Sequence, residues 1–446
     1  MAVNREKPLV GIDIGTSKIS CIIGQVTKDG HIDITGYGVS PSKGLAKGVV
    51  VNIEETSQSI ASSVEKAERL AGIKVGSANV GVTGSHISSI NSRGVVAVSK
   101  LNREIGHEDV ARVMDSARAV AIPPQREVLH VIPRTYVIDG QDGVRDPIGM
   151  SGYRLEVETH IVTGAVSILN NLYKAVQRVG IEVEELVLES LAASEAVLGE
   201  AEKRLGVVLV DIGSGTTDIA IYIDGTIWHT AVLPIGGNHI TNDIAIVLRT
   251  PLETAERLKT KYGDASVIGS MKGYYGGYYG HDNWKLRKVD ENPKIEEQPD
   301  EMIEVEAFEI GSKQRVSRKT LNEVIYARAR QLFEMVQGEI KKSGYDAMIP
   351  AGIVLTGGSA SLAGITDAAA HILRMPVRVG VPRGMSGMGG DALNNPTYSA
   401  GVGLVLWGLK KMNGEAILQE PRRASSGGGG VGRKFSGWLR NFLPSQ

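Results

Sequence analysis

The sequence predicts an α/β protein built from two related lobes, and an internal repeat carries that prediction. Residues 9–26 read LVGIDIGTSKISCIIGQV and residues 207–223 read VVLVDIGSGTTDIAIYI. Each stretch is an apolar strand, an Asp-Ile-Gly turn with small polar residues, and a second apolar strand. Similarity at long spacing within one chain indicates duplicated architecture. We therefore expect two α/β lobes, each opening with a β-hairpin whose turn faces the other lobe.

Length and composition are consistent with a soluble protein of this class. The chain has 446 residues, enough for about two to four domains with sizeable cores. A net charge of −1 argues against bulk nucleic-acid binding, so we expect no nucleic-acid partner. Cys21 is the single cysteine, which excludes a disulfide framework or a cysteine-based metal site within the chain and fits a reducing cytosol. Residues 1–8 are polar and unlike a signal peptide, and no apolar run reaches the roughly 20 residues that span a bilayer.

The remaining pattern alternates strands and helices. Further strands are predicted at 31–39, 77–82, 94–99, 128–138, 152–162, 183–188, 226–233 and 353–356. Helices are predicted at 52–71, 107–120, 166–179, 190–203, 238–248, 317–343, 362–373 and 399–411, with Pro251 at the first turn of one more. The segment 271–302 is rich in Tyr and Gly at its start, breaks the pattern, and is predicted to be a long surface loop.

These elements divide into lobes and smaller units. Residues 1–84, completed by 163–192 and 393–411, are predicted to form the core of the first lobe, and 85–162 an inserted small α+β domain. Residues 193–236 and 343–392 are predicted to form the core of the second lobe, and 237–342 its small domain, with 271–302 as an atypical insertion. A flexible linker, 412–431, and an amphipathic tail, 432–446, complete the chain.

The two repeated turns have the chemistry of a phosphate-binding site. In the first turn, Gly15 lets backbone N–H groups approach phosphate oxygens, and Thr16, Ser17 and Lys18 add two hydroxyl donors and a cation. Asp13 ends a strand and is expected to hold Mg2+ through water, as is Asp211 in the second turn. The second turn repeats the other donors with Gly213, Ser214, Gly215, Thr216 and Thr217. Two such turns facing each other would clamp the triphosphate of ATP and its Mg2+.

A third element is expected to hold the adenosine. The strand at 353–356 leads into Gly357, Gly358 and Ser359 and then a helix, whose N-terminus favours negative charge. The two glycines allow flat approach of an adenosine. Taken alone, either Asp-Ile-Gly segment is equally well explained as a tight β-turn. All three elements in this order favour a nucleotide site.

In this order the three elements resemble the phosphate and adenosine motifs of the actin, Hsp70 and sugar-kinase superfamily. Residues 189–193 (ESLAA) and 398–403 (YSAGVG) resemble its two connecting helices, where the lobes cross. The resemblance implies an actin-like ATPase fold of two duplicated ribonuclease-H-like domains. It also implies that Gly236, Gly237, Glu256 and Lys259 belong to the nucleotide site. Glu189 is the candidate for positioning water if ATP is hydrolysed, although a solvated residue at a helix start explains it equally well.

Further motifs resemble the bacterial FtsA family of cell-division proteins. They are GSHI (84–87), NSRG (91–94), HVIP (130–133), DPIGMSG (146–152), VLPIGG (232–237) and TNDIA (241–245). The resemblance covers nearly the whole chain except 271–302. It implies a protein at the division septum that polymerises, links the tubulin-like protein FtsZ to the cytoplasmic face of the membrane, and recruits later division proteins through 85–162.

The resemblance also implies a docking site for the C-terminal peptide of FtsZ on the small domain of the second lobe. Arg318 and Arg328 fall at that site, and arginines suit an acidic peptide through bidentate pairing. A solvated helix face explains either arginine nearly as well. The insertion 271–302 is foreign to the family pattern and lies in the same domain.

The tail has the pattern of a helix that lies in a membrane surface. Apolar residues repeat at helical spacing, and basic residues beside them can reach anionic headgroups. The apolar set is Phe435, Trp438, Leu439, Phe442 and Leu443, and the basic set is Arg433, Lys434 and Arg440. A helix this short is marginal in water, so we expect it to form on lipid, weakly for one copy and strongly for a polymer of many copies. A helix that docks in a protein groove is the alternative.

Two functions from different classes remain open. The favoured one is a polymerising membrane adaptor in which ATP binding is a structural switch and hydrolysis is weak or regulatory. The alternative is a sugar-kinase-type phosphotransferase, which would need an aspartate base beside a sugar pocket. No such segment stands out, and a kinase has no use for the tail.

Overall fold

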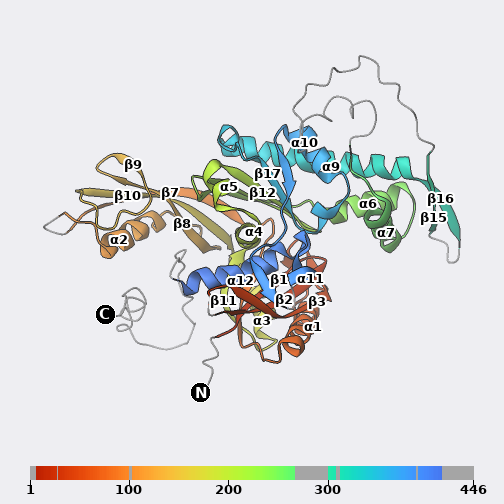
Figure 1. Cartoon of the computed structure of the whole chain (residues 1–446), viewed down its shortest axis with the longest axis horizontal. Coiled ribbons are helices and arrows are strands. Elements are labelled where there is room, and N and C mark those ends of the chain that lie inside the picture. Colours follow the sequence, from red (N-terminus) through yellow and green to blue (C-terminus); the bar gives the residue numbers. More distant parts are fainter. Residues whose placement is uncertain are drawn as a thin grey trace, which may run out of the picture.

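The computed structural model describes residues 7–27, 29–99, 103–266, 300–307, 312–387 and 390–413. The predicted tail, the linker beyond residue 413 and the segment 271–302 up to residue 299 lie outside these residues. The described part is elongated, with two sheet-based lobes at its centre and a smaller unit at each end (Figure 1). Within it, no helix combines the length and the apolarity that crossing a membrane requires.

The first lobe is built on a six-stranded sheet with the order β11-β6-β1-β2-β3-β19. Its strands are β1 (Leu9–Ile14), β2 (Lys18–Val26), β3 (Ile32–Pro41), β6 (Ser77–Val82), β11 (Glu182–Leu188) and β19 (Met385–Gly387). β1 forms a hairpin with β2 and runs parallel to β6, which in turn runs parallel to β11. The carboxyl ends of β1, β6 and β11 therefore meet at one edge of the sheet.

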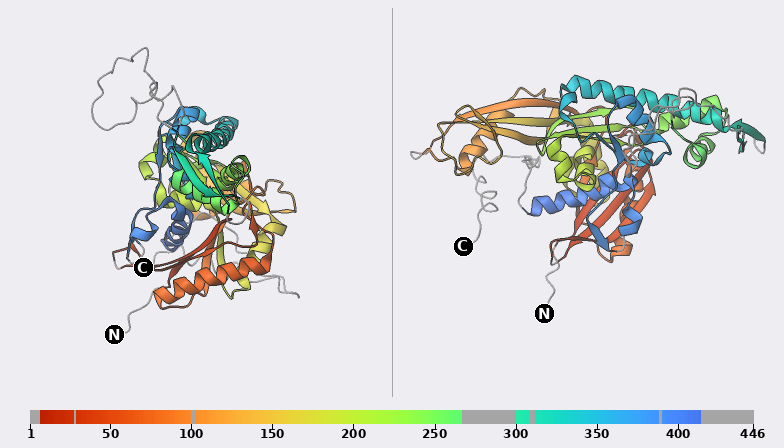
Figure 2. Two further views of the ribbon diagram at one scale, coloured as in Figure 1. Left: turned by 90° about the vertical axis from the view of Figure 1, so that its right-hand side faces the viewer. Right: turned by 45° about the horizontal axis from the view of Figure 1, so that its top comes forward.

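Two helices cover opposite faces of this sheet. α1 (Ile53–Ala71) lies on β2 and β3, where a Cβ added at Gly38 would be 2.0 Å from the carbonyl oxygen of Ser63. α12 (Ser399–Met412) lies on the other face, where a Cβ added at Gly11 would be 2.7 Å from the carbonyl oxygen of Gly401. The missing side chains let both helices lie directly on the strands. Figure 2 shows the sheet between α1 in orange and α12 in blue.

The second lobe repeats this plan around a five-stranded sheet with the order β14-β13-β12-β17-β18. Its strands are β12 (Val207–Ile212), β13 (Thr217–Ile223), β14 (Thr226–Leu233), β17 (Ile353–Thr356) and β18 (Val377–Val379). β12 forms a hairpin with β13 and runs parallel to β17, as β1 does with β2 and β6. The repeat in the sequence is therefore a repeat in the structure, which confirms the two-lobed α/β fold.

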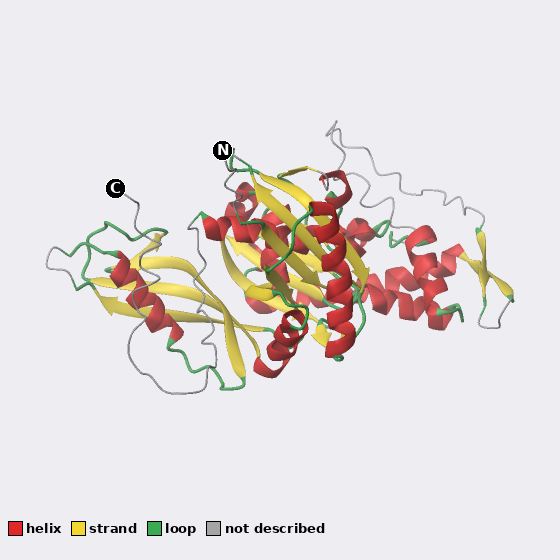
Figure 3. Cartoon of the chain, turned by 90° about the horizontal axis from the view of Figure 1, so that it is seen from below, coloured by secondary structure: helices red, strands yellow, loops and turns green. Residues whose placement is uncertain are grey.

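Smaller units extend the molecule at both ends (Figure 3). One end carries the sheet β7-β10-β8-β9, built from β7 (Ser88–Ala97), β8 (Arg126–Ile138), β9 (Gln141–Val144) and β10 (Arg154–Ala165), with α2 (His107–Arg118) on one face. We call this unit the inserted domain. The other end carries α6 (Gly237–Val247), α7 (Leu252–Tyr262) and the hairpin of β15 (Met302–Glu306) and β16 (Lys313–Ser317). The helix α9 (Arg318–Ser343) joins this end to α10 (Ile365–Leu373) in the second lobe.

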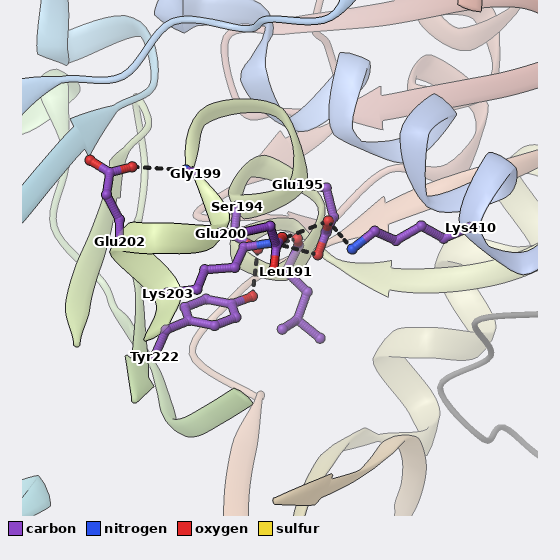
Figure 4. Close-up of polar contacts among 9 residues, drawn as sticks. All are labelled: Leu191, Ser194, Glu195, Gly199, Glu200, Glu202, Lys203, Tyr222 and Lys410. Atoms are coloured by element: carbon purple, nitrogen blue, oxygen red, sulfur yellow. Dashed lines mark hydrogen bonds and ion pairs between the residues drawn. The ribbon is translucent and has the colours of Figure 1, made fainter. Parts of the chain in front are cut away.

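Two helices cross between the lobes and pack closely. α4 (Glu189–Val197) follows β11, and α12 crosses it so tightly that a Cβ added at Gly403 would lie 1.8 Å from the carbonyl oxygen of Ala192. Polar contacts reinforce the crossing: Lys410 of α12 pairs with Glu195 of α4 at 2.5 Å (Figure 4). Glu195 also pairs at 3.3 Å with Lys203, a buried side chain of α5 (Glu200–Leu205).

The carboxyl-terminal end of α12 is fixed by a second carboxylate. Glu185 of β11 accepts hydrogen bonds from the Trp407 indole at 3.1 Å and from the Lys411 ammonium at 2.9 Å. Lys410 and Lys411 therefore tie the last turn of α12 to two different elements, α4 between the lobes and β11 of the first lobe.

Several sequence predictions need correction. The single helix predicted at 190–203 is two helices, because Leu198 and Gly199 are extended and break it between α4 and α5. The helix expected at 362–373 begins at Ile365, and Gly358–Ser361 form a separate 3-10 turn. Pro251 caps α7 rather than occupying its first turn. The hairpin β15–β16 was not predicted.

The crossing of α4 and α12 gives a test of packing. Gly403→Ala places a methyl group against the backbone of α4, and we expect a loss of about 3 kcal/mol in the free energy of unfolding. Gly338→Ala is the matched control, because Gly338 lies inside α9 and a Cβ there meets nothing within 4 Å. That change should stabilise the protein by roughly 0.5–1 kcal/mol. Urea unfolding followed by circular dichroism measures both, and equal effects would contradict the tight crossing.

Candidate functional site: a cleft between the lobes

A cavity of about 800 Å³ lies between the two hairpin turns. Most residues predicted for the nucleotide site line it, and they come from β1, β2, α4, β12, α6, α7 and the turn after β17. They are Asp13, Gly15, Thr16, Ser17, Lys18, Glu189, Asp211, Gly213, Ser214, Gly215, Thr216, Gly237, Glu256, Lys259, Gly357, Gly358 and Ser359. The structure therefore brings together residues from three distant parts of the chain.

Two predicted residues lie behind the cavity wall instead. Thr217 donates its hydroxyl hydrogen to the carbonyl oxygen of Ile235 at 2.8 Å. Gly236 packs on the back of the second turn, where an added Cβ would lie 2.6 Å from the carbonyl oxygen of Gly213. Both residues stabilise the conformation of the second turn and do not line the cavity.

The two turns touch each other across the cleft. An added Cβ at Gly215 would lie 2.7 Å from the Thr16 hydroxyl, and that hydroxyl accepts a hydrogen bond from the Gly48 N–H at 3.0 Å. Only glycine at position 215 leaves room for the first turn. The lobes therefore approach each other at the turns that the sequence singled out.

Four buried carboxyl groups lie at this cleft: three of them line the cavity, and the fourth, Asp218, is not a lining residue but interacts electrostatically with the other three. Asp13, Asp211, Asp218 and Glu189 are each at most 9% exposed. Burial raises the pKa of all four, and repulsion from neighbouring carboxylates raises the pKa of Asp211 and Glu189 further. Lys18 lowers the pKa of Asp13 and Asp211, but burial reduces its own pKa to about 8. The cleft thus holds more acidic than basic groups, and burial and mutual repulsion favour the neutral, protonated form of the acidic ones.

Lys18 is held in place by the opposite wall. Its ammonium group donates to the carbonyl oxygen of Thr397 at 2.7 Å and lies 3.7 Å from the centre of the Tyr398 ring. Both residues directly precede α12. This geometry places the cation at the mouth of the first turn, beside Asp13.

One further residue of the cleft, Thr83, was not assigned from the sequence. Thr83 follows β6, and its hydroxyl donates to the carboxylate of Asp218 on β13 at 2.6 Å, which joins the two lobes. Thr83 and Glu189 come directly after the parallel strands β6 and β11, so both lie at the edge where β1 ends. Residues at the carboxyl ends of adjacent parallel strands are the signal that would have identified Thr83.

The far end of the cavity is formed by α6, α7 and the turn after β17. Lys259 donates to the Gly237 carbonyl oxygen at 3.3 Å and to Thr241 at 2.9 Å, and it pairs with Glu256 at 2.6 Å. Gly357 has φ +83, and an added Cβ would lie 2.2 Å from a carboxylate oxygen of Asp211. The surface beyond Gly357 is the 3-10 turn, not the N-terminus of α10, so the predicted helix-terminus contact is corrected.

Arg318 and Arg328, predicted for peptide docking, both form ion pairs within the chain. Arg328 makes a bidentate pair with Asp243 of α6 at 2.5 and 2.8 Å. Arg318 pairs with Glu301 at 2.6 Å. An acidic peptide that used these arginines would have to compete with Asp243 and Glu301. The membrane residues predicted in the tail lie outside the described part of the chain.

Asp218 offers a test of the crowded charge. Its pKa is raised from 3.8 to about 7, mainly by burial. Between these two values the folded state binds a proton that the unfolded state does not, so the folded state loses this proton, and the free energy of unfolding falls, as the pH rises to 7. In the nucleotide-free protein, the free energy of unfolding of the wild type relative to Asp218→Asn should increase by about 1.4 kcal/mol from pH 8 to pH 6. Urea titrations across this range measure the difference, and a constant difference would contradict a raised pKa.

Two family models match this chain. The family model described as "Cell division protein FtsA" matches residues 208–403, and the model "SHS2 domain inserted in FTSA" matches residues 84–163. The cell division protein FtsA of Pseudomonas aeruginosa is 46% identical over 412 residues, which cover 92% of this chain and 92% of that protein. The protein of the same name from Escherichia coli (strain K12) is 35% identical over 442 residues, covering 97% of this chain and 98% of that protein.

Solved structures show the same fold at low sequence identity. The "PilM-PilN type IV pilus biogenesis complex" has a TM-score of 0.61 at 14% identity and covers 90% of this chain and 98% of that chain. MreB5 of Spiroplasma citri bound to ADP has a TM-score of 0.51 at 12% identity and covers 92% of this chain and 99% of that chain. The fold is actin-like, as predicted. With relatives this similar along almost its full length, the chain belongs to the FtsA family of actin-like cell-division proteins.

Proposed function

We propose that this protein binds ATP with Mg2+ in the cleft, assembles with further copies of itself, and anchors the FtsZ ring to the cytoplasmic face of the membrane at the division septum. In this proposal the C-terminal tail contacts lipid and the inserted domain recruits later division proteins. Membership of the FtsA family supports this adaptor function over a sugar-kinase-type phosphotransferase. ATP then serves chiefly to control assembly.

The observation that carries nucleotide binding is the set of three buried carboxyl groups, Asp13, Asp211 and Glu189, that line the cavity together with two glycine-containing turns. Oxygen ligands of this kind suit Mg2+, which usually keeps several waters and binds through one or two carboxylates and substrate phosphates. Among the described residues, no three His, Cys, Asp or Glu side chains are grouped closely enough to hold a metal by themselves. A metal held by Asp13 and Asp211 through water, with phosphate as its other ligand, fits this donor set.

The remaining residues of the cleft fit the parts of the nucleotide. Backbone N–H groups and hydroxyls of Gly15–Ser17 and Gly213–Thr216 would hold the phosphates, with Lys18 as the nearby cation. Gly357–Ser359, Glu256 and Lys259 would hold the adenosine at the other end. When bound, Mg2+ supplies positive charge that balances both the phosphates and the carboxylates.

Glu189 is suited to position water beside the terminal phosphate. It is the first residue of α4, it lines the cavity, and its Oε1 atom is buried without a hydrogen-bond partner in the described structure. A buried acceptor without a partner is costly and rare, so a bound water or ligand group is expected there. Hydrolysis by this arrangement would be slow or regulatory, as proposed from the sequence.

Peptide docking is proposed on the small domain of the second lobe. The pairs of Arg328 with Asp243 and of Arg318 with Glu301 would exchange for pairs with carboxylates of the FtsZ peptide. The bidentate geometry of Arg328 shows that its guanidinium already presents two donors to a carboxylate.

Nucleotide binding is tested by removing one metal-holding carboxylate. Asp211→Asn should weaken binding of ATP in the presence of Mg2+ on the order of 10- to 100-fold, because a neutral amide replaces one of the carboxylates proposed to hold the metal through water. With EDTA in place of Mg2+ the variant should bind no worse than the wild type. Asp115→Asn, at an exposed position of α2, is the control. Isothermal titration calorimetry measures all three proteins, and failure of the wild type to bind ATP would sink the proposal.

Membrane attachment is tested with the tail. Trp438→Glu places a charge on the apolar face of the predicted helix and should abolish co-sedimentation with vesicles that contain anionic lipid. Trp284→Glu makes the same chemical change outside the tail and should leave co-sedimentation intact. Equal sedimentation of both variants with lipid would show that the tail is not the anchor.

A further inference from the structure

One buried histidine of the inserted domain reaches the wall of the nucleotide cleft. His130 lies on β8 and has no exposed surface. Its Nε2 atom accepts a hydrogen bond from the backbone N–H of Leu188 at 3.0 Å. Leu188 is the last residue of β11 and the residue before Glu189. A side chain of the inserted domain therefore holds the backbone next to the proposed water-positioning carboxyl group.

The Leu188 N–H needs such an acceptor because of its place in the sheet. Among the described strands, β11 lies at the edge of the first sheet and has β6 as its one neighbour there. At the start of α4 the Leu188 side chain provides no capping hydrogen bond. A buried N–H at this position would lose a partner without His130, and such a loss is unfavourable.

The ring of His130 is fixed in the form that accepts this bond. Nε2 accepts, so the neutral ring carries its proton on Nδ1. Burial lowers the pKa of His130 to about 3, so the ring stays neutral over the physiological range. The ring also packs edge-on against Trp407 of α12, with the ring centres 5.5 Å apart. Trp407 in turn donates to Glu185 of β11, so the histidine is also held by contacts that involve α12.

We propose that His130 is a positioning residue that holds the start of α4, and through it the Glu189 carboxyl group, in the nucleotide cleft. The hydrogen bond fixes where β11 ends and α4 begins. Glu189 follows immediately and has no hydrogen-bond partner of its own at Oε1, so its position depends on the backbone that carries it. The inserted domain thereby becomes part of the support of the cleft, and a partner that moves β8 would also move Glu189.

The proposal has a structural half, that His130 holds the start of α4, and a functional half, that this contact supports the cleavage of ATP. The functional half rests on the proposed nucleotide binding, whereas the structural half does not. In hydrolysis the oxygen of water bonds to the γ-phosphorus, the bond from that phosphorus to the β–γ bridging oxygen breaks, and ADP, phosphate and a proton are released. His130 touches none of these atoms and acts only through Glu189.

Hydrogen–deuterium exchange of the nucleotide-free full-length protein tests the structural half. His130→Leu removes the acceptor and keeps an apolar side chain, so exchange in peptides covering 188–191 should rise on the order of ten-fold. His130→Gln returns an acceptor oxygen at similar reach and should restore most of the protection. Unchanged exchange in His130→Leu overturns the proposal.

A second buried histidine of the same sheet is the matched control. His160 on β10 is 1% exposed, burial lowers its pKa to about 3, and its partners are Asn91 of β7 and Thr230 of β14. His160→Leu makes the same chemical change without removing the acceptor of Leu188. Its exchange at 188–191 should match the wild type, and an equal rise in both variants would show a general loosening of the inserted domain instead.

Single-turnover cleavage of ATP tests the functional half. His130→Leu should slow cleavage about ten-fold or more, with ATP affinity within about three-fold of the wild type. In a Glu189→Gln background the same change should have no further effect on the rate. If His130→Leu slows cleavage in that background as much as it does in the wild type, the claim that His130 acts through Glu189 is overturned. If the wild type binds no ATP, the proposed function fails and the exchange result alone decides on His130; if it binds but never cleaves ATP, the functional half is overturned.

Discussion

Mutual repulsion among four carboxyl groups, held out of water between two sheets, is the constraint on which the rest of the cleft depends. Asp13 and Asp211 occupy equivalent positions at the ends of β1 and β12, Glu189 lines the cavity with them, and Asp218 interacts electrostatically with all three. Such a group is unfavourable unless protons or cations balance it. The fold opposes that cost with the rigid hairpins, the Thr83 bond to Asp218 and the contacts of Lys18. A metal nucleotide would relieve the same imbalance, which links ligand binding to the fit of the lobes.

The elements around the cleft divide the task of holding it. Parallel strands bring Thr83 and Glu189 to the edge where β1 ends, and the glycines at 357 and 215 allow other groups to approach within a few ångströms. The crossing of α4 and α12 joins the lobes, while the inserted domain supports the start of α4 from outside. Segments that are far apart in the sequence therefore position the side chains around one cleft.

Much of the fold could be predicted because local sequence patterns determine many of its strands and helices. The strands 77–82, 226–233 and 353–356 have the predicted bounds, and Asn52 caps α1 where the helix was expected to begin. The repeated Asp-Ile-Gly turns pointed to both sides of the cleft, and the structure places those turns in contact. The break at Gly199 was missed because glycine within a helical pattern does not by itself end a helix.

The contacts that tune the site could not be predicted in the same way. Thr83 and Asp218 are far apart in the sequence, and their bond depends on how two lobes meet. The pairing of Arg328 with Asp243 depends on the packing of α9 against α6. The role of His130 follows from a single backbone N–H at the edge of a sheet. Tertiary neighbours of this kind leave no periodic pattern in the chain.

The anchored end of α12 has a mechanical consequence. The chain leaves the described body just beyond Met412, and the last turn before that point is tied to Glu195 and Glu185 through Lys410 and Lys411. Tension applied to the C-terminal segment would load both of these ion pairs. Because the same helix crosses α4, part of a load on the C-terminal segment would pass to α4 as well.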